Sequence, residues 1–296
     1  MLTRRRFIAI SAALAPSMAL AQSELHVETG IALGATVTLR LQHPDAPRLA
    51  SLAMAEIRRL ESVFSIYLPD SSLSRLNREG ALAAPPFELL DCLSLAGAVH
   101  RASVGRFDPT VQPLWQAEAL ALQRGSPLTD TERTDVRARI GWNGVTLAAE
   151  AITLRPGMAL TLNGIAQGYI ADRVATLLAD HGLTQALIDT GEMVALSGQG
   201  WPVHLPDHKI DLRGRALATS APLGMTFGGD GKTSHILNPG TGRPARSPWK
   251  SVTVSAQSAA LADAISTAAC LIEVKDAVGT LCDQFPGTIL ESAIPL

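Results

Sequence analysis

Hydrophobic and polar residues alternate over residues 32–41, ALGATVTLRL, and this period of two predicts a β-strand. Apolar residues then recur every three or four positions over residues 48–64, which predicts a helix with one buried face. The polar stretch at residues 65–80 is predicted as a loop. The helical spacing returns in four later segments, at residues 89–103, 128–140, 168–181 and 260–272.

Short apolar runs between turn residues predict the remaining strands. They lie at residues 145–147, 151–154, 186–189, 194–196, 203–205, 216–219 and 251–255. Helices mixed with clusters of strands that pair antiparallel favour the α+β class over an alternating parallel fold. Residues 22–296 contain no linker, repeat or low-complexity tract, so we expect one domain.

The N-terminus has the pattern of an export signal. Residues 3–8, TRRRFI, are basic and carry a twin-arginine pair, an apolar stretch runs to about residue 20, and Ala19-Leu20-Ala21 is a small-x-small cleavage site. We therefore expect residues 1–21 to be a signal peptide and the mature chain to be periplasmic. The apolar stretch is short for a membrane span, and no span is expected after cleavage.

Charge and cysteine content narrow the class of protein further. The formal net charge is −2, and it becomes −5 when Arg4, Arg5 and Arg6 leave with the signal. No basic stripe with interleaved aromatic residues appears, so we expect no nucleic-acid partner. The odd number of cysteines, three, does not form a disulfide framework, and we expect free thiols, with Cys92 and Cys270 buried in helices.

One predicted helix also carries candidate chemistry. Asp263 and Thr267 are four residues apart in the Ala-rich segment 260–272, so a carboxylate and a hydroxyl share one helix face. Two hard oxygen donors suit Mg²⁺, which completes its shell with water, carbonyl and phosphate oxygens. The pattern therefore indicates phosphate-ester or pyrophosphate chemistry.

A set of motifs in order extends this indication. Taken together, the segments resemble the ApbE family, the FAD:protein FMN transferases, over nearly the whole mature chain. The segments are SIYLPDSSLSRLN (65–77), GRFDPTVQPLW (105–115), LNGIAQGYIAD (162–172), SHILNPGTGRP (234–244), SVTVS (251–255) and ADAIST (262–267). The resemblance implies a single T-fold-related domain with antiparallel sheets packed by helices.

The resemblance also implies a reaction. A Thr or Ser hydroxyl of a target protein attacks the phosphorus on the FMN side of FAD, AMP leaves, and FMN stays attached through a phosphoester. It implies Mg²⁺ held by Asp263, Thr267 and the backbone carbonyl of Gly164. His235 matches a histidine near the FMN phosphate, so either His235 or Asp263 is the expected general base.

The remaining site residues are also implied by the resemblance. The matched FAD-contacting positions are Leu33, Tyr67, Arg106, Phe107, Asp108, Thr161, Gln167, Leu237 and Ser266. Asp108 precedes Pro109, so it fits a turn as well as a ligand contact. Thr161 and Gln167 stand where many members have Asp and Lys; the chain thus lacks one anion and one cation of the commoner pattern.

Three functions remain open from the sequence. The first is FMN transfer to a flavoprotein subunit of a periplasm-facing electron-transfer complex. The second is an Mg²⁺-dependent FAD pyrophosphatase that uses water in place of the target hydroxyl. The third is a non-catalytic periplasmic protein that binds or delivers FAD.

Overall fold

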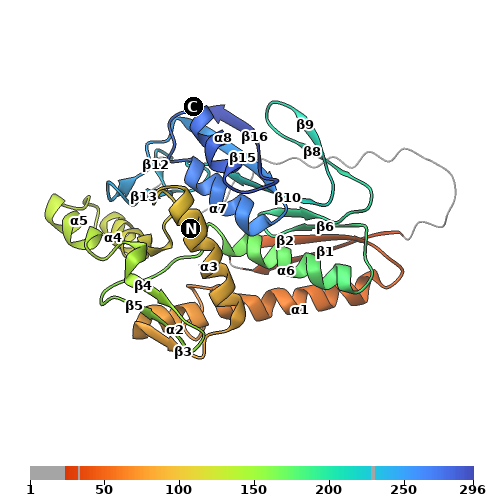
Figure 1. Ribbon diagram of the computed structural model, residues 1–296, viewed down its shortest axis with the longest axis horizontal. Helices are drawn as coiled ribbons and strands as arrows, with labels where there is room; N and C mark the ends of the chain where they lie inside the picture. The colour runs from red at the N-terminus through yellow and green to blue at the C-terminus, as the bar shows by residue number, and fades with distance from the viewer. Residues whose placement is uncertain (1–23, 33, 228–230) are drawn as a thin grey trace.

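A computed structural model describes residues 24–32, 34–227 and 231–296. Its centre is a seven-stranded sheet in the order β1–β2–β6–β7–β10–β15–β16, in which every neighbouring pair is antiparallel (Figure 1). The strands are β1 (Leu25–Ala32), β2 (Ala35–Gln42), β6 (Ala186–Asp189), β7 (Met193–Ala195), β10 (Arg215–Ser220), β15 (Trp249–Ala256) and β16 (Ile289–Pro295).

Both faces of this sheet are covered at its centre. Neighbouring residues of a strand point to opposite sides, so one strand contributes side chains to two cores. Ile188 and Val194 pack into the main core with the helices. Leu187 and Leu217 instead join a smaller core beneath the β8–β9 hairpin. The elements concerned are α1 (Ala46–Phe64), α6 (Ala166–Asp180), α7 (Ala259–Ala269), α8 (Lys275–Asp283), β8 (Trp201–His204) and β9 (Lys209–Leu212).

A second group of elements lies beside the main sheet, in the left half of Figure 1. It contains the small sheet β3–β5–β4, four helices and two 3-10 turns. Their bounds are α2 (Ser72–Glu79), β3 (Ala81–Ala83), α3 (Phe87–Ala102), η1 (Pro109–Val111), α4 (Gln112–Gln123), α5 (Asp130–Arg137), η2 (Trp142–Gly144), β4 (Val145–Leu147) and β5 (Ala151–Leu154).

Four two-residue strands form two small hairpins late in the chain. They are β11 (Thr226–Phe227) with β12 (Thr233–Ser234), and β13 (Leu237–Asn238) with β14 (Arg243–Pro244).

The architecture confirms the predicted α+β class and the five predicted helices. Residues 65–80 were predicted as a loop, and this was wrong, because α2 lies there. Ser71 accepts a hydrogen bond from the Ser74 N–H, and Gly80 ends the helix with φ 72°. The sequence prediction also missed β1, α4, α8 and β16. At the start of α5, Thr129 and Glu132 form a capping box, which confirms one of the two expected caps.

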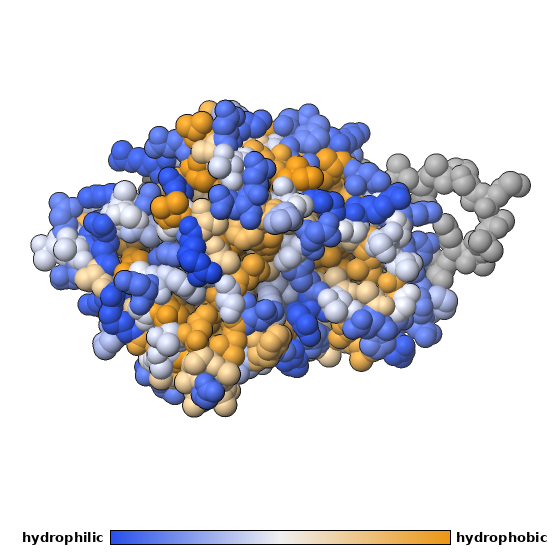
Figure 2. Space-filling model, viewed as in Figure 1, coloured by the Kyte–Doolittle hydropathy of each residue, from blue (hydrophilic) through white to orange (hydrophobic). Residues whose placement is uncertain are grey.

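The three cysteines are free, and Cys92 and Cys270 are buried as expected; Cys282, for which no burial was predicted, is buried too. Within the described ranges no helix is both long enough and apolar enough to cross a bilayer. On the face shown in Figure 2, apolar residues gather around α2, β3 and the start of α3, where Phe87 is 69% exposed. The predicted signal peptide, residues 1–21, lies outside the described residues.

Candidate active site

Helix α7 carries Asp263, Ser266 and Thr267 and lies in the main core between α6 and the sheet. Its small alanine side chains allow close packing on both sides. Ser258 begins the helix, and its hydroxyl accepts a hydrogen bond from the Leu261 N–H at 3.2 Å. Because most side chains of α7 are buried, the packing of this helix fixes the face that carries the candidate ligands.

A second cap of α7 comes from α6. Asp172 accepts hydrogen bonds from the N–H groups of Ala259 at 2.7 Å and Ala260 at 3.0 Å, and from the Ser258 hydroxyl at 2.7 Å. A carboxylate at a helix N-terminus satisfies otherwise unpaired N–H groups and interacts favourably with the dipole. Burial nevertheless raises the pKa of Asp172, and the three hydrogen bonds oppose that rise.

Gly168 makes the contact between α6 and α7 possible. A Cβ at this position would lie 2.3 Å from the carbonyl oxygen of Ala259 and 2.6 Å from the nitrogen of Ala260. Only glycine permits two helix backbones to approach this closely. The Gly168 N–H also donates a hydrogen bond to the carboxylate of Asp263.

Asp263 is the buried acid of the site, with 4% of its surface exposed. Burial raises its pKa to about 8, against the opposing hydrogen bond from Gly168. Its Oδ2 atom has no hydrogen-bond partner among the described residues. A buried carboxylate oxygen without a donor is costly, and a cation would satisfy it.

The other two predicted metal ligands meet beside this acid. A Cβ on Gly164 would lie 3.1 Å from Thr267 Oγ1, so the backbone of Gly164 runs directly past that hydroxyl. On the far side, the Ser220 hydroxyl lies 3.2 Å from Thr267 Oγ1 and 2.8 Å from Ser266 Oγ. Ser220 therefore orients both α7 hydroxyls from the end of β10.

The donor set fits Mg²⁺, since it combines one carboxylate, one hydroxyl and one backbone carbonyl. Among the described residues no group of three or more His, Cys, Asp or Glu side chains could hold a metal ion. A cation held at Asp263 would thus depend on oxygens from water or phosphate to complete its shell, which suits a site for a diphosphate substrate.

The segment at residues 106–108 reaches the same place from the end of α3. The ring of Phe107 would lie 3.4 Å from a Cβ on Gly164, so the two predicted site residues touch. Arg106 donates to the Ser103 carbonyl at 3.2 Å. Asp108 accepts hydrogen bonds from the N–H and hydroxyl of Thr110, which confirms the predicted turn.

Thr161 and Gln167 flank the Gly164 bend. The Thr161 N–H donates to the Pro109 carbonyl at 2.8 Å, which joins the bend to the turn that follows Asp108. The Gln167 amide donates to the Thr190 carbonyl at 3.1 Å, and the Thr190 hydroxyl donates to the Gln167 carbonyl at 2.9 Å. Gln167 therefore holds the β6–β7 turn through an uncharged amide. A lysine at this position would add a positive charge.

His235 and Leu237 come from the small hairpins. The Nδ1 atom of His235 lies 2.8 Å from the Met225 carbonyl and 3.2 Å from the Pro222 carbonyl. Because carbonyl oxygens only accept, the proton of the neutral ring belongs on Nδ1, and Nε2 is the basic nitrogen. Leu237 is buried and pairs with Pro244.

Two predicted flavin contacts are placed less fully. Tyr67 is 59% exposed in the loop after α1, where its N–H is bound by the Ser65 hydroxyl at 3.1 Å. Leu33 lies outside the described residues. The structure thus brings Phe107, Gly164, Ser266 and Thr267 together directly.

The sequence prediction missed three residues that shape the site. Gly168 and Asp172 stand within the motif at residues 162–172 but were assigned only to a helix, and Ser220 ends a short strand. The spacing of Gly168 and Asp172, one turn apart, places them on one face of α6. That face was identifiable as a packing surface, but its partner in α7 was not.

Comparison with known proteins identifies the class. The ApbE family model matches residues 33–288, so the chain belongs to the ApbE family. An "FAD:protein FMN transferase" of Vibrio cholerae is 29% identical over 286 residues, covering 86% of this chain and 85% of that protein. One of Klebsiella pneumoniae is 27% identical over 259 residues, with 79% and 78% covered.

Solved structures agree on the fold. The apo form of the flavinyl transferase ApbE from Pseudomonas stutzeri superposes with a TM-score of 0.81 at 23% identity. The match covers 94% of this chain and 97% of that one. An ApbE protein from Thermotoga maritima superposes with a TM-score of 0.79 at 24% identity, covering 92% and 97%.

Proposed function

We propose that this chain is an FAD:protein FMN transferase that acts in the periplasm on a Ser or Thr of a target flavoprotein. The family, the activity for which its relatives are named and the site geometry support this function. The observation that carries it is the buried Asp263, whose Oδ2 has no donor among the described residues, beside the Thr267 hydroxyl and the Gly164 backbone.

The chemistry is a phosphoryl transfer. The target hydroxyl oxygen bonds to the phosphorus on the FMN side of FAD, the bond to the bridging oxygen breaks, and AMP leaves with that oxygen. Mg²⁺ would be held by Asp263, Thr267 and the Gly164 carbonyl, where it would neutralise charge on the diphosphate. The enzyme's own residues then need to orient FAD and to accept the proton of the hydroxyl.

We assign His235 Nε2 as the base that accepts the proton of the target hydroxyl. The two carbonyls at Nδ1 hold the ring in one tautomer, which leaves Nε2 with the lone pair. Asp263 is less suited to this step, because a carboxylate that binds a cation is a poor base. Phe107, next to Gly164, and Tyr67 would supply apolar and aromatic contacts to the flavin and adenine rings.

The test is incubation with FAD and Mg²⁺, with and without a peptide containing Asp-x-x-Ser/Thr-Gly-Ala-Ser/Thr. We expect AMP together with covalent FMN on the peptide. Asp263→Asn should abolish AMP release, while Asp180→Asn, at the exposed end of α6, should leave it unchanged. Equal amounts of free FMN and AMP regardless of the peptide would show a pyrophosphatase, and FAD binding without AMP release would show a delivery protein.

The biological partner is proposed on the same grounds. The twin-arginine pattern at residues 3–8 supports export, and an exported FMN transferase needs an acceptor on the periplasmic side. We therefore propose a flavoprotein subunit of a periplasm-facing electron-transfer complex as the target. Fractionation of cells that express the full chain would test the location, since a cytoplasmic mature protein contradicts it.

A further inference from the structure

Helices α4 and α5 pack against the small hairpins rather than against the main sheet (Figure 1). The ring of Trp115 on α4 lies against that of Phe227 on β11, with centroids 5.7 Å apart. Arginine side chains make further contacts, which converge on one turn. That turn, residues 238–243, comprises the last residue of β13, the four connecting residues and the first residue of β14.

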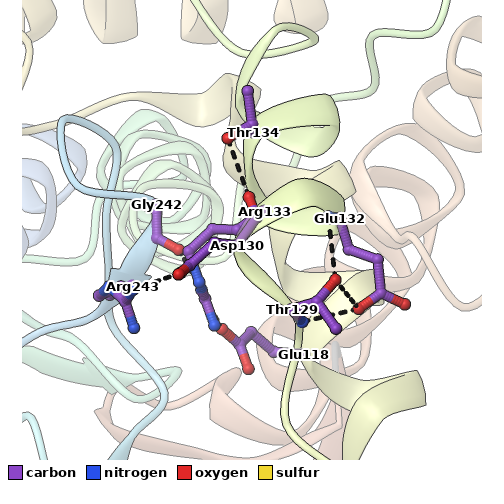
Figure 3. A network of polar contacts seen from close by, with 8 residues as sticks. All are labelled: Glu118, Thr129, Asp130, Glu132, Arg133, Thr134, Gly242 and Arg243. Carbon is purple, nitrogen blue, oxygen red and sulfur yellow. Dashed lines mark hydrogen bonds and ion pairs between the residues drawn. The ribbon is translucent and has the colours of Figure 1, made fainter.

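Arg133 is the buried member of this set, with 7% of its surface exposed. Its Nη1 atom donates to Glu118 Oε1 of α4 at 2.6 Å and also to the carbonyl of Gly242 (Figure 3). A buried guanidinium is stable only where acceptors of this kind surround it. Arg133 therefore joins α4, α5 and the turn at a single atom.

Two further arginines reinforce the connection. Arg137, one turn later on α5, donates to the Gly240 carbonyl at 2.5 Å. Arg243 of β14 in turn donates a hydrogen bond to Asp130 Oδ1 of α5 at 2.9 Å (Figure 3). Gly242 itself has φ 64°, and a Cβ there would lie 2.5 Å from the Arg137 side chain, so the turn fits α5 closely.

The turn needs this support because its strands are short. β13 and β14 contain two residues each, and an isolated two-stranded hairpin is at best marginally stable in water. The turn's own hydrogen bonds are few, from the Gly242 N–H to the Asn238 carbonyl at 2.8 Å and from the Thr241 N–H to Asn238 Oδ1 at 3.1 Å. Leu237 and His235 lie one and three residues before Asn238.

We infer that Arg133 is a positioning residue for the FAD site: it fixes the 238–243 turn and, through it, Leu237 and His235. This inference rests on the proposed function, because that function gives Leu237 and His235 their roles. Arg133 acts through the turn, since its hydrogen bonds go to Glu118 of α4 and to the Gly242 carbonyl. Loss of its side chain should therefore weaken FAD binding while the acid and hydroxyls of α7 stay in place.

The experiment compares Arg133→Met and Arg133→Lys with a matched control, Arg124→Met. Arg124 pairs with Glu132 within the same helix pair, and its other hydrogen bonds go to the Ser126 and Pro127 carbonyls, away from the turn. Two quantities are measured: the Kd for FAD with Mg²⁺, by flavin fluorescence, and hydrogen exchange of residues 234–245. Hydrogen exchange is measured without FAD, so it reports the stability of the turn independently of flavin binding.

We expect Arg133→Met to speed exchange at residues 234–245 and to raise the FAD Kd roughly tenfold, the lower end of the loss seen at metal sites when a residue that orients a ligand is removed. Arg133→Lys should recover part of both effects, because an ammonium still donates to one carbonyl. Arg124→Met should change neither. Unchanged exchange in Arg133→Met would show that Arg133 does not stabilise the turn. Faster exchange with an unchanged FAD Kd would show that Arg133 does not position the FAD site.

The proposed function fails separately, if the wild-type protein neither binds FAD nor releases AMP. The exchange measurement then still decides whether Arg133 holds the turn. A result in which the wild type is active, and Arg133→Met has faster exchange and weaker FAD binding, supports both.

Discussion

The two sides of the candidate site are built in different ways. On one side, α7 is a core helix that α6 caps and contacts backbone to backbone at Gly168. On the other, Leu237 lies on the two-residue strand β13 and His235 lies between β12 and β13, next to a turn whose carbonyls are bound by arginines of α5. The proposed metal ligands therefore share the stability of the fold, whereas His235 and Leu237 depend on a separate support.

This difference predicts that substitutions on the two sides affect stability and FAD binding differently. Changes at the α6–α7 contact should lower the free energy of unfolding and the activity together. Changes around α5 should alter FAD binding with a smaller loss of stability. The predictions that follow test the first side, then the contact between the two sides.

The largest effect is expected for Gly168→Ala. The added methyl would sit 2.3 Å from a backbone oxygen of α7, so α6 and α7 must move apart. We expect a loss of about 3 kcal/mol in the free energy of unfolding, the upper end of the usual range for overpacked core sites, because the clash is with backbone atoms. Urea unfolding measures it, and Mg²⁺-dependent FAD binding should weaken in parallel.

Gly279→Ala is the matched control for that substitution. Gly279 lies within α8, and no atom lies within 4 Å of the position its Cβ would take. Alanine in an open helical position stabilises by roughly 0.5–1 kcal/mol relative to glycine. If both substitutions changed stability equally, the close contact between α6 and α7 would have no special importance.

Asp172→Ala removes the second cap of α7. Three hydrogen bonds to a carboxylate disappear, two of them from the first N–H groups of the helix. We expect about 2–4 kcal/mol of destabilisation, given the usual strength of hydrogen bonds to charged groups. Asp172→Asn, which keeps one acceptor, should lose less, and thermal melts of the two variants measure the order.

The α7 side was largely predictable from the sequence, and the α5 side was not. Helical spacing alone puts Asp263 and Thr267 on one face, since four residues make about one turn. The support from Arg133 joins positions 109 residues apart, and no local pattern signals such a contact. The missed α2 has a different cause: its capping residues, Ser71 and Gly80, stand in a polar stretch that resembles a loop.

The pKa of Asp263 predicts a pH dependence. In the apo protein burial raises this pKa from 3.8 to about 8, so between these values the folded state holds a proton that the unfolded state releases. The free energy of unfolding should therefore fall as the pH rises from about 4 to about 8, by at most about 1.4 kcal/mol per unit. Asp263→Asn should remove this part of the dependence.

Magnesium reverses that direction, because it binds the ionised carboxylate. Below pH 8 the Mg²⁺ affinity should rise up to about tenfold per pH unit, as a proton must leave for the cation to bind. Titration calorimetry at pH 6, 7 and 8 measures the slope. An affinity that does not change over this range would remove Asp263 from the metal site.

The smallest effect is expected for Ser220→Ala, at the point where the two sides meet. Its hydroxyl contacts Ser266 and Thr267 on α7, and two residues later the Pro222 carbonyl lies against the ring of His235. Removing the hydroxyl should cost about 1 kcal/mol of stability, the worth of an ordinary hydrogen bond. It should also weaken Mg²⁺ binding, because Thr267 loses the group that orients it.

Thr219→Val is the control, since it removes a hydroxyl from the neighbouring residue of β10, where the partner is Thr253. If the two sides are supported separately, Ser220→Ala should lower Mg²⁺ affinity without speeding hydrogen exchange at residues 234–245. Faster exchange there would mean that α7 also stabilises the hairpins through Ser220, and the division drawn between the core side and the arginine-supported side would be wrong.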